Sequence, residues 1–218
     1  MKAWCGNDSN RPDAPRPSTP SSLSAVTKQR LLFLGPPGAG KGTQAQQLAA
    51  QQGLLHLSTG DLLRAEVAAG TALGQEAQAV MARGELVSDS LVLAIVRSRL
   101  EQQSASLSRG EAGPNGWLLD GFPRNLAQAE ALEALLNDLN QPIELVVLLE
   151  LDDGVLMQRL LSRGRDDDNS AVIQHRLEVY RQQTAPLIAY YSERNLLQPV
   201  AAEGSVDDVA SRIESLLQ

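Results

Sequence analysis

The sequence predicts an α/β fold in which helices flank both faces of a doubly wound, five-stranded parallel sheet. Short apolar runs alternate along the chain with longer segments of helical pattern, as parallel strands and their crossover helices do. The run 143–151 is almost continuously apolar, which is typical of a strand buried on both faces. In addition, a glycine-rich turn at 35–40 joins an apolar run to a segment without helix breakers.

The order of the elements follows from these runs and from the residues that interrupt them. We expect strands at 31–34, 53–57, 117–120, 143–151 and 196–201, and helices at 44–52, 61–69, 73–83, 89–103, 125–139, 155–161, 170–191 and 206–217.

Local signals support the individual elements. Ser88 can cap the helix that begins at Asp89, and Pro186 should kink or restart the long helix at 170–191. Three glycines and a proline within 104–116 predict a loop there. The helix at 125–139 is amphipathic, and the residues available for its buried face are Ala127, Ala131, Leu132, Leu135 and Leu139.

Composition limits the classes of protein that this chain can be. Its 218 residues suit one α/β domain with a modest insertion, and its net charge of −7 argues against general binding of nucleic acids or membrane surfaces. Cys5 is the single cysteine, so neither an intrachain disulfide nor a cysteine-based zinc site is expected. No apolar run approaches the ~20 residues that span a bilayer, and we expect a cytoplasmic protein.

The first 27 residues differ from the remainder, and we place the folded domain at 28–218. Four prolines between Pro12 and Pro20 stand among serines, a composition that predicts a disordered extension. A transit peptide is the alternative, but Asp8 and Asp13 are untypical of such peptides.

A phosphate-binding loop is predicted after the first strand. Gly35, Gly40 and Lys41 have the spacing of such a loop, and a strand before it and a helix after it supply the required context. Glycines allow backbone N–H groups to approach phosphate oxygens, while the helix N-terminus and the lysine add positive charge. Thr43 offers a hydroxyl to Mg²⁺ one residue later than usual, because Gly42 takes the usual position. A plain glycine-rich connector would not need this lysine, so we predict binding of a nucleoside triphosphate.

Charged residues elsewhere suit phosphoryl transfer. Asp120 ends an apolar strand where an acid can reach Mg²⁺ directly or through water, although a helix-capping role is the alternative. The arginines near predicted loops and helix ends are Arg64, Arg124, Arg159, Arg163, Arg165 and Arg176. One arginine alone is usually a surface charge. Six so placed in an acidic chain favour the neutralisation of phosphates on two substrates.

Four motifs together resemble the adenylate kinase family of nucleoside monophosphate kinases. They are GPPGAGKGT at 35–43, STGDLLR at 58–64, DGFPR at 120–124 and RGRDDDN at 163–169, and TAPLIAYY at 184–191 is also similar to a family segment. The similarity runs in family order from about 28 to 218. It implies a phosphate-loop kinase fold with a small monophosphate-binding insertion at about 58–87. It also implies a short lid at about 162–172, without the zinc that some longer lids carry.

The resemblance assigns roles to individual residues. ATP would be held by Gly38, Ala39, Gly40, Lys41, Gly42, Thr43, Arg159, Arg163 and Gly204. AMP would be held by Thr59, Arg64, Glu85, Leu86, Val87, Gly121, Phe122, Pro123, Arg124, Gln128, Arg165 and Arg176. The transferring phosphoryl group would be stabilised by Lys41, Arg124, Arg163, Arg165 and Arg176. Mg²⁺ bound with ATP is the implied cofactor, with Thr43 and Asp120 as its protein contacts.

The implied reaction is reversible transfer from ATP to AMP, giving two ADP, and two other functions stay open. A UMP/CMP kinase typically carries Ala and Asn where Thr59 and Gln128 stand, although Asn125 is more usual in that branch. A nucleotide-dependent switch without transfer would not need arginines around a second site. We expect a monomer without nucleic-acid or membrane partners, since no long apolar surface stripe or heptad repeat is visible.

Overall fold

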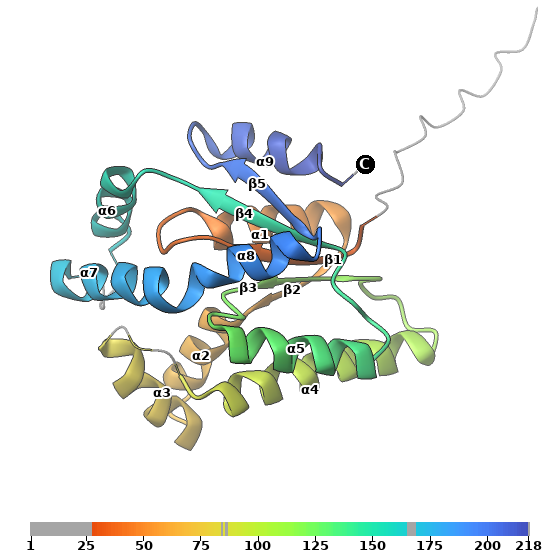
Figure 1. Cartoon of the computed structure of the whole chain (residues 1–218). Helices are drawn as coiled ribbons and strands as arrows, with labels where there is room; N and C mark the ends of the chain where they lie inside the picture. The colour runs from red at the N-terminus through yellow and green to blue at the C-terminus, as the bar shows by residue number, and fades with distance from the viewer. Residues whose placement is uncertain (1–27, 84, 86, 165–168, 218) are drawn as a thin grey trace, which may run out of the picture.

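A five-stranded parallel sheet forms the centre of the computed structural model, which describes residues 28–83, 85, 87–164 and 169–217 (Figure 1). The strands are β1 (Arg30–Leu34), β2 (Leu55–Ser58), β3 (Trp117–Asp120), β4 (Leu145–Glu150) and β5 (Leu197–Ala201). They lie in the order β2-β3-β1-β4-β5, and every neighbouring pair is parallel. This arrangement confirms the predicted doubly wound sheet.

Helices cover both faces of the sheet. They are α1 (Lys41–Gln52), α2 (Thr59–Ala68), α3 (Ala72–Ala82), α4 (Asp89–Ser108), α5 (Leu126–Asp138), α6 (Asp153–Ser162), α7 (Ser170–Val179), α8 (Pro186–Glu193) and α9 (Val206–Glu214), with a π-helical turn η1 (Tyr180–Thr184) between α7 and α8.

Two apolar cores lie on opposite sides of the sheet, because successive strand residues point to opposite faces. On β1, Leu31 and Phe33 join the core that contains α1, α6, α7 and α9. Leu32 and Leu34 join the core that contains α4, α5 and α8. All four side chains are at most 3% exposed. Burial on both faces explains why the central strands read as continuous apolar runs.

Two expectations about helices were wrong. The loop predicted from 104 begins later, because α4 continues to Ser108 and ends before Gly110, whose φ is 74°. On α5, Ala127 and Ala131 are exposed, and the buried face instead consists of Gln128, Ala129, Leu132, Leu135 and Leu136. A helix with 3.6 residues per turn can bury Leu132 and Leu135 together with either Ala127 and Ala131 or Ala129. The leucines alone therefore do not determine which alanines are buried.

The predicted interruption of the long helix near Pro186 is confirmed as a restart, because α8 begins at Pro186 after a π-helical turn. Proline has no N–H to donate, so the helix cannot continue with an unbroken ladder of α-helical hydrogen bonds. The backbone N–H of Ala185 donates to the carbonyl of Tyr180, five residues earlier, at 2.8 Å. This π-helical turn inserts extra backbone before α8 and turns Tyr180 and Thr184 toward the cavity described below.

The two ends of the described domain meet. The ammonium of Lys28 donates to the carbonyl of Leu216 at 2.9 Å, so the chain enters the domain beside the end of its last helix (Figure 1). Residues 1–27 lie outside the described part, and their predicted disorder stays a prediction. Within the described ranges, no helix has the length and apolar character needed to cross a membrane.

Candidate active site

A cavity of about 820 Å³ opens at the carboxyl ends of the strands, beside the loop that follows the central strand β1. Ligands of doubly wound sheets bind at this edge, where the strand order reverses. Every site residue predicted from the sequence that falls in the described part lines this cavity. Leu86 and Arg165 lie outside the described residues, so their predicted roles stay predictions.

The phosphate loop presents the open N-terminus of α1 to the cavity. Gly40 precedes α1 with a φ of 96°, a left-handed conformation that glycine adopts without strain. No side chain caps this helix end, and its first turn contains no acidic residue. Its free N–H groups and the positive end of the helix dipole therefore remain available to an anion.

Lys41 folds back over the loop from which it starts. Its ammonium donates to the carbonyls of Gly35 and Pro36 at 2.7 and 3.0 Å. Burial lowers its pKa to about 8; the Asp120 carboxylate opposes the shift, whereas Arg124 and Arg163 add to it. A phosphate placed here would supply the negative charge that this buried ammonium lacks.

Asp120 and Thr43 both line the cavity, and each offers it oxygen donors. Asp120 is 7% exposed at the end of β3, and its Oδ2 would lie 3.4 Å from a Cβ atom added to Gly42. Glycine at that position therefore keeps the space between loop and carboxylate open. Carboxylate and hydroxyl oxygens suit Mg²⁺, which usually retains waters and substrate phosphates as its other ligands. In the described residues no three His, Cys, Asp or Glu side chains cluster, and the two donors present fit an ion brought in with a nucleotide.

The cavity concentrates positive charge in an acidic chain. Its cationic side chains are Lys41, Arg64, Arg124, Arg159, Arg163 and Arg176, whereas its acidic side chains are Asp61, Glu85 and Asp120. The chain as a whole carries a net charge of −7. The excess of cations here is therefore local, and it matches a ligand or ligands carrying several phosphates.

Several elements deliver these cations to one place. Arg159 of α6 donates to the carbonyl of Ala202 at 3.2 Å, beside the loop that contains Gly204. Arg176 of α7 donates to the carbonyl of Met81 at 3.5 Å, which joins α7 to the end of α3. Arg64 of α2 forms an ion pair with Asp61 in its own helix. The arginines therefore come from helices on both sides of the cavity.

Three hydrogen bonds hold Arg124 and its backbone in place. Its Nε donates to the carbonyl of Gly121 at 2.7 Å, and its backbone N–H donates to Gln128 Oε1 at 2.6 Å. Its backbone carbonyl accepts from the Thr184 hydroxyl at 2.7 Å. Burial lowers the pKa of this guanidinium, with the charge of Asp120 opposing the shift. Two of these hydrogen bonds hold the backbone of Arg124, and the third orients its side chain before any ligand arrives.

Two buried polar side chains complete the side of the cavity opposite the loop. Thr59 and Gln128 are 3% and 2% exposed, and both line the cavity. The Thr59 hydroxyl lies 3.4 Å from the carbonyl of Asp120, its hydrogen-bond acceptor. Glu85 lies at the rim in an ion pair of 2.9 Å with Arg83, which lowers the pKa of its carboxyl.

Several polar residues of this cavity were not predicted from the sequence, and Gln44, Tyr180 and Thr184 are among them. Thr184 and Tyr180 reach it from the π-helical turn, and burial raises the pKa of Tyr180 to about 12. Gln44 lies on α1, and its amide donates to the carbonyl of Val206 at 2.8 Å. The proline at 186 signalled an irregular helix, but its position alone did not show which side chains the irregularity would turn inward.

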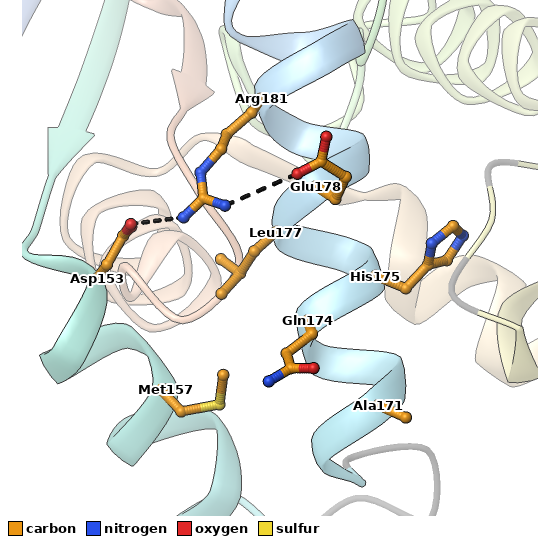
Figure 2. A pocket seen from close by; sticks show the side chains of 8 residues that line it. All are labelled: Asp153, Met157, Ala171, Gln174, His175, Leu177, Glu178 and Arg181. Carbon is orange, nitrogen blue, oxygen red and sulfur yellow. Dashed lines mark hydrogen bonds and ion pairs between the residues drawn. The ribbon is translucent and has the colours of Figure 1, made fainter.

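A second hollow, of about 540 Å³, lies between α6 and α7 and is a weaker candidate (Figure 2). Figure 2 shows Arg181 pointing between two acids, Asp153 at 2.5 Å and Glu178 at 3.9 Å. Met157 and Leu177 are the apolar side chains that line it together with Ala171. Because two carboxylates face one guanidinium here, this hollow lacks the cationic excess of the first cavity.

This chain has the features that define a phosphate-loop nucleotide kinase: a parallel sheet, a phosphate loop, and arginines from several helices around the same cavity. A sequence model described as adenylate kinase matches residues 33–196. A Synechococcus protein (strain CC9311) named adenylate kinase is 67% identical over 190 residues, covering 87% of this chain and 99% of that protein. A namesake from Prochlorococcus marinus (strain MIT 9303) is 65% identical with the same coverage. The chain belongs to the adenylate kinase family.

Proposed function

We propose that this chain transfers the terminal phosphoryl group of ATP to AMP, reversibly, to give two molecules of ADP. The observation that carries the proposal is one cavity with a phosphate loop on one side and half-buried Arg124 with buried Thr59 and Gln128 on the other. Such a cavity can hold two phosphate-bearing substrates with their phosphates between the two sides. The relatives named adenylate kinase support the same reaction.

The donor nucleotide would bind along the phosphate loop. Backbone N–H groups of 38–43 and the N-terminus of α1 would contact its phosphates, while Lys41 would follow the group in transfer. Arg159 lies beside the loop that contains Gly204, so these two residues would flank the rest of the nucleotide. Mg²⁺, when bound with ATP, would neutralise charge on its outer phosphates, with Thr43 and Asp120 as protein contacts.

The acceptor would bind between the proposed insertion at 58–87 and α5. Arg64 and Arg124 would hold its phosphate, and Gln128 would contact the base, since an amide both donates and accepts at an adenine edge. Thr59, Gly121, Phe122, Pro123, Glu85 and Val87 would complete this side of the site. Leu86 is proposed for the same place on the family resemblance alone.

Transfer needs no covalent enzyme intermediate. Lys41, Arg124, Arg163 and Arg176, together with Arg165 on the resemblance, would stabilise the charge that spreads over the moving phosphoryl group. Fixed guanidinium groups do this without reorganising as the reaction proceeds. Closure of the insertion, and of the short lid proposed at 162–172, would exclude water so that ATP is not hydrolysed instead.

Residues of one chain line both sides of the cavity, so we propose a monomer acting on ATP, AMP and ADP in the cytoplasm. The relatives named adenylate kinase favour this reaction over the nearest alternative, UMP/CMP kinase activity. Thr59 and Gln128, both buried against the acceptor side, favour AMP.

The deciding experiment measures ADP formation by the purified chain with MgATP and, in turn, AMP, CMP, UMP or no acceptor. We expect rapid turnover with AMP and little with the others. Preference for CMP or UMP would move the chain to the sister activity, and turnover that ignores the acceptor would refute the transfer mechanism.

A further inference from the structure

Gln128 is held between two partners of opposite hydrogen-bonding character. Its Oε1 accepts from the backbone N–H of Arg124 at 2.6 Å, and its Nε2 donates to Asp89 Oδ1 at 2.6 Å. A backbone N–H can only donate, and an ionised carboxylate can only accept. Reversing the amide would place a donor against a donor and an acceptor against the carboxylate. These two partners together therefore fix which way the buried amide faces.

A fixed amide distinguishes purines by the atoms at position 6. Each end of the Gln128 amide keeps one unused hydrogen-bonding position, a lone pair on the oxygen and a hydrogen on the nitrogen. The adenine edge offers a matching donor, the 6-amino group, and a matching acceptor, N1. Hypoxanthine and guanine offer the reverse pair, a 6-oxo acceptor and an N1–H donor. The Gln128 amide could form both hydrogen bonds to these bases only if its oxygen and nitrogen exchanged places.

We propose that Asp89 is a positioning residue that locks the Gln128 amide and thereby excludes 6-oxopurine monophosphates from the acceptor site. The inference rests on the proposed function, in which Gln128 contacts the acceptor base. Asp89 itself does not appear among the residues that line the described cavity, and it acts through Gln128. It reaches that amide from the first turn of α4, directly after the proposed insertion.

A purely structural role for Asp89 predicts a different outcome. An acid in the first turn of α4 also stabilises that helix through the helix dipole. Loss of helix stability would affect every acceptor alike. Loss of the contact between Asp89 and Gln128 would instead change the ratio of kcat/KM between acceptors, because only the reversed amide can form both hydrogen bonds to a 6-oxopurine.

The test compares kcat and KM for AMP and IMP in the wild type, Asp89→Asn and Asp89→Ala. Asparagine keeps the shape but can donate to a reversed amide. We expect the IMP-to-AMP ratio of kcat/KM to rise about tenfold, the size of one charge-assisted hydrogen bond, because Arg124 still favours the original orientation. The loss for AMP should lie mainly in KM. Glu101→Gln is the control, because it removes a carboxylate from the same helix, where Glu101 pairs with Arg97.

An unchanged ratio in both Asp89 variants, with folding retained, would overturn the proposal. A similar rise in Glu101→Gln would overturn it as well, since the effect would then be one of charge. Calorimetric binding of AMP and IMP separates this inference from the proposed function. If the wild type fails to phosphorylate AMP, the proposed function falls, and the shift in binding ratio between wild type and Asp89→Asn still decides the role of Asp89.

Discussion

Replacement of Lys41 by methionine should stabilise the nucleotide-free protein while abolishing its activity. The Lys41 side chain is half-buried in the phosphate loop, and desolvation lowers the pKa of its ammonium from the ordinary 10.5 to about 8. Each pKa unit corresponds to about 1.4 kcal/mol, so the folded state disfavours the charged form by roughly 3 kcal/mol. Partial solvent contact and the loss of hydrogen bonds to Gly35 and Pro36 reduce the gain, and we expect about 1–2 kcal/mol at pH 7.

The sign of the pH dependence is fixed by the direction of the shift. Below about pH 8 the lysine is charged in both states, so the cost of burying it is fully present. As the pH rises from 8 toward 10.5, the folded protein holds fewer protons than the unfolded chain, and the wild type recovers stability. The advantage of Lys41→Met should therefore shrink across this window.

Urea unfolding without nucleotide, at intervals from pH 7 to pH 10, measures this difference. Lys28→Met is a matched control, because Lys28 lies outside the cavity, bonded to the carbonyl of Leu216, and its replacement should not add stability. MgATP should reverse the order by stabilising the wild type more than Lys41→Met. A Lys41→Met protein that is less stable than the wild type at pH 7, or a difference that does not change with pH, would refute the reasoning.

Three further predictions concern the acceptor side. Arg124→Ala should lower kcat by about a thousandfold in a coupled ADP assay while leaving the unfolding midpoint nearly unchanged; near-normal turnover would contradict its role. Thr184→Val leaves the carbonyl of Arg124 without its 2.7 Å donor and should lower kcat/KM for AMP about tenfold, whereas Thr184→Ser should restore it. Gly74→Ala would place a Cβ atom 2.1 Å from the carbonyl of Glu66, so α2 and α3 must separate. We expect it to raise KM for AMP several-fold with KM for ATP unaffected, and an equal change in both would count against an effect confined to the insertion.

The sequence predicted the elements whose signals are local. The strand at 117–120 was predicted at its observed bounds, because an apolar run ends there at an acid followed by glycine. The glycine-rich turn between β1 and α1 was also predicted, since glycines and one lysine at fixed spacing determine its backbone and charge, although α1 begins at Lys41 rather than at 44. The resemblance to the family was confirmed by relatives of 65–67% identity.

Features that depend on distant contacts were not predictable in this way. The buried face of α5 is fixed by what packs against it, and alanines at 127, 129 and 131 give no preference among themselves. The length of α4 depends on where Gly110 turns the chain, beyond a serine-rich stretch that reads as loop. The contact between Gln128 and Asp89 joins residues 39 positions apart, and nothing in either local sequence indicates it.

The contact between Lys28 and Leu216 has a consequence for how the chain could be rearranged. Because the two ends of the domain already touch, a short peptide could join them without crossing the sheet or the cavity. New termini could then open in the exposed segment 109–113, outside all five strands and all nine α-helices of the described ranges. The circularly permuted chain would begin just before β3 and end after α4. In this chain the insertion at 58–87 would lie near the C-terminus, and the acceptor-side residues 120–128 would lie near the N-terminus. Every strand would keep its neighbours in the sheet.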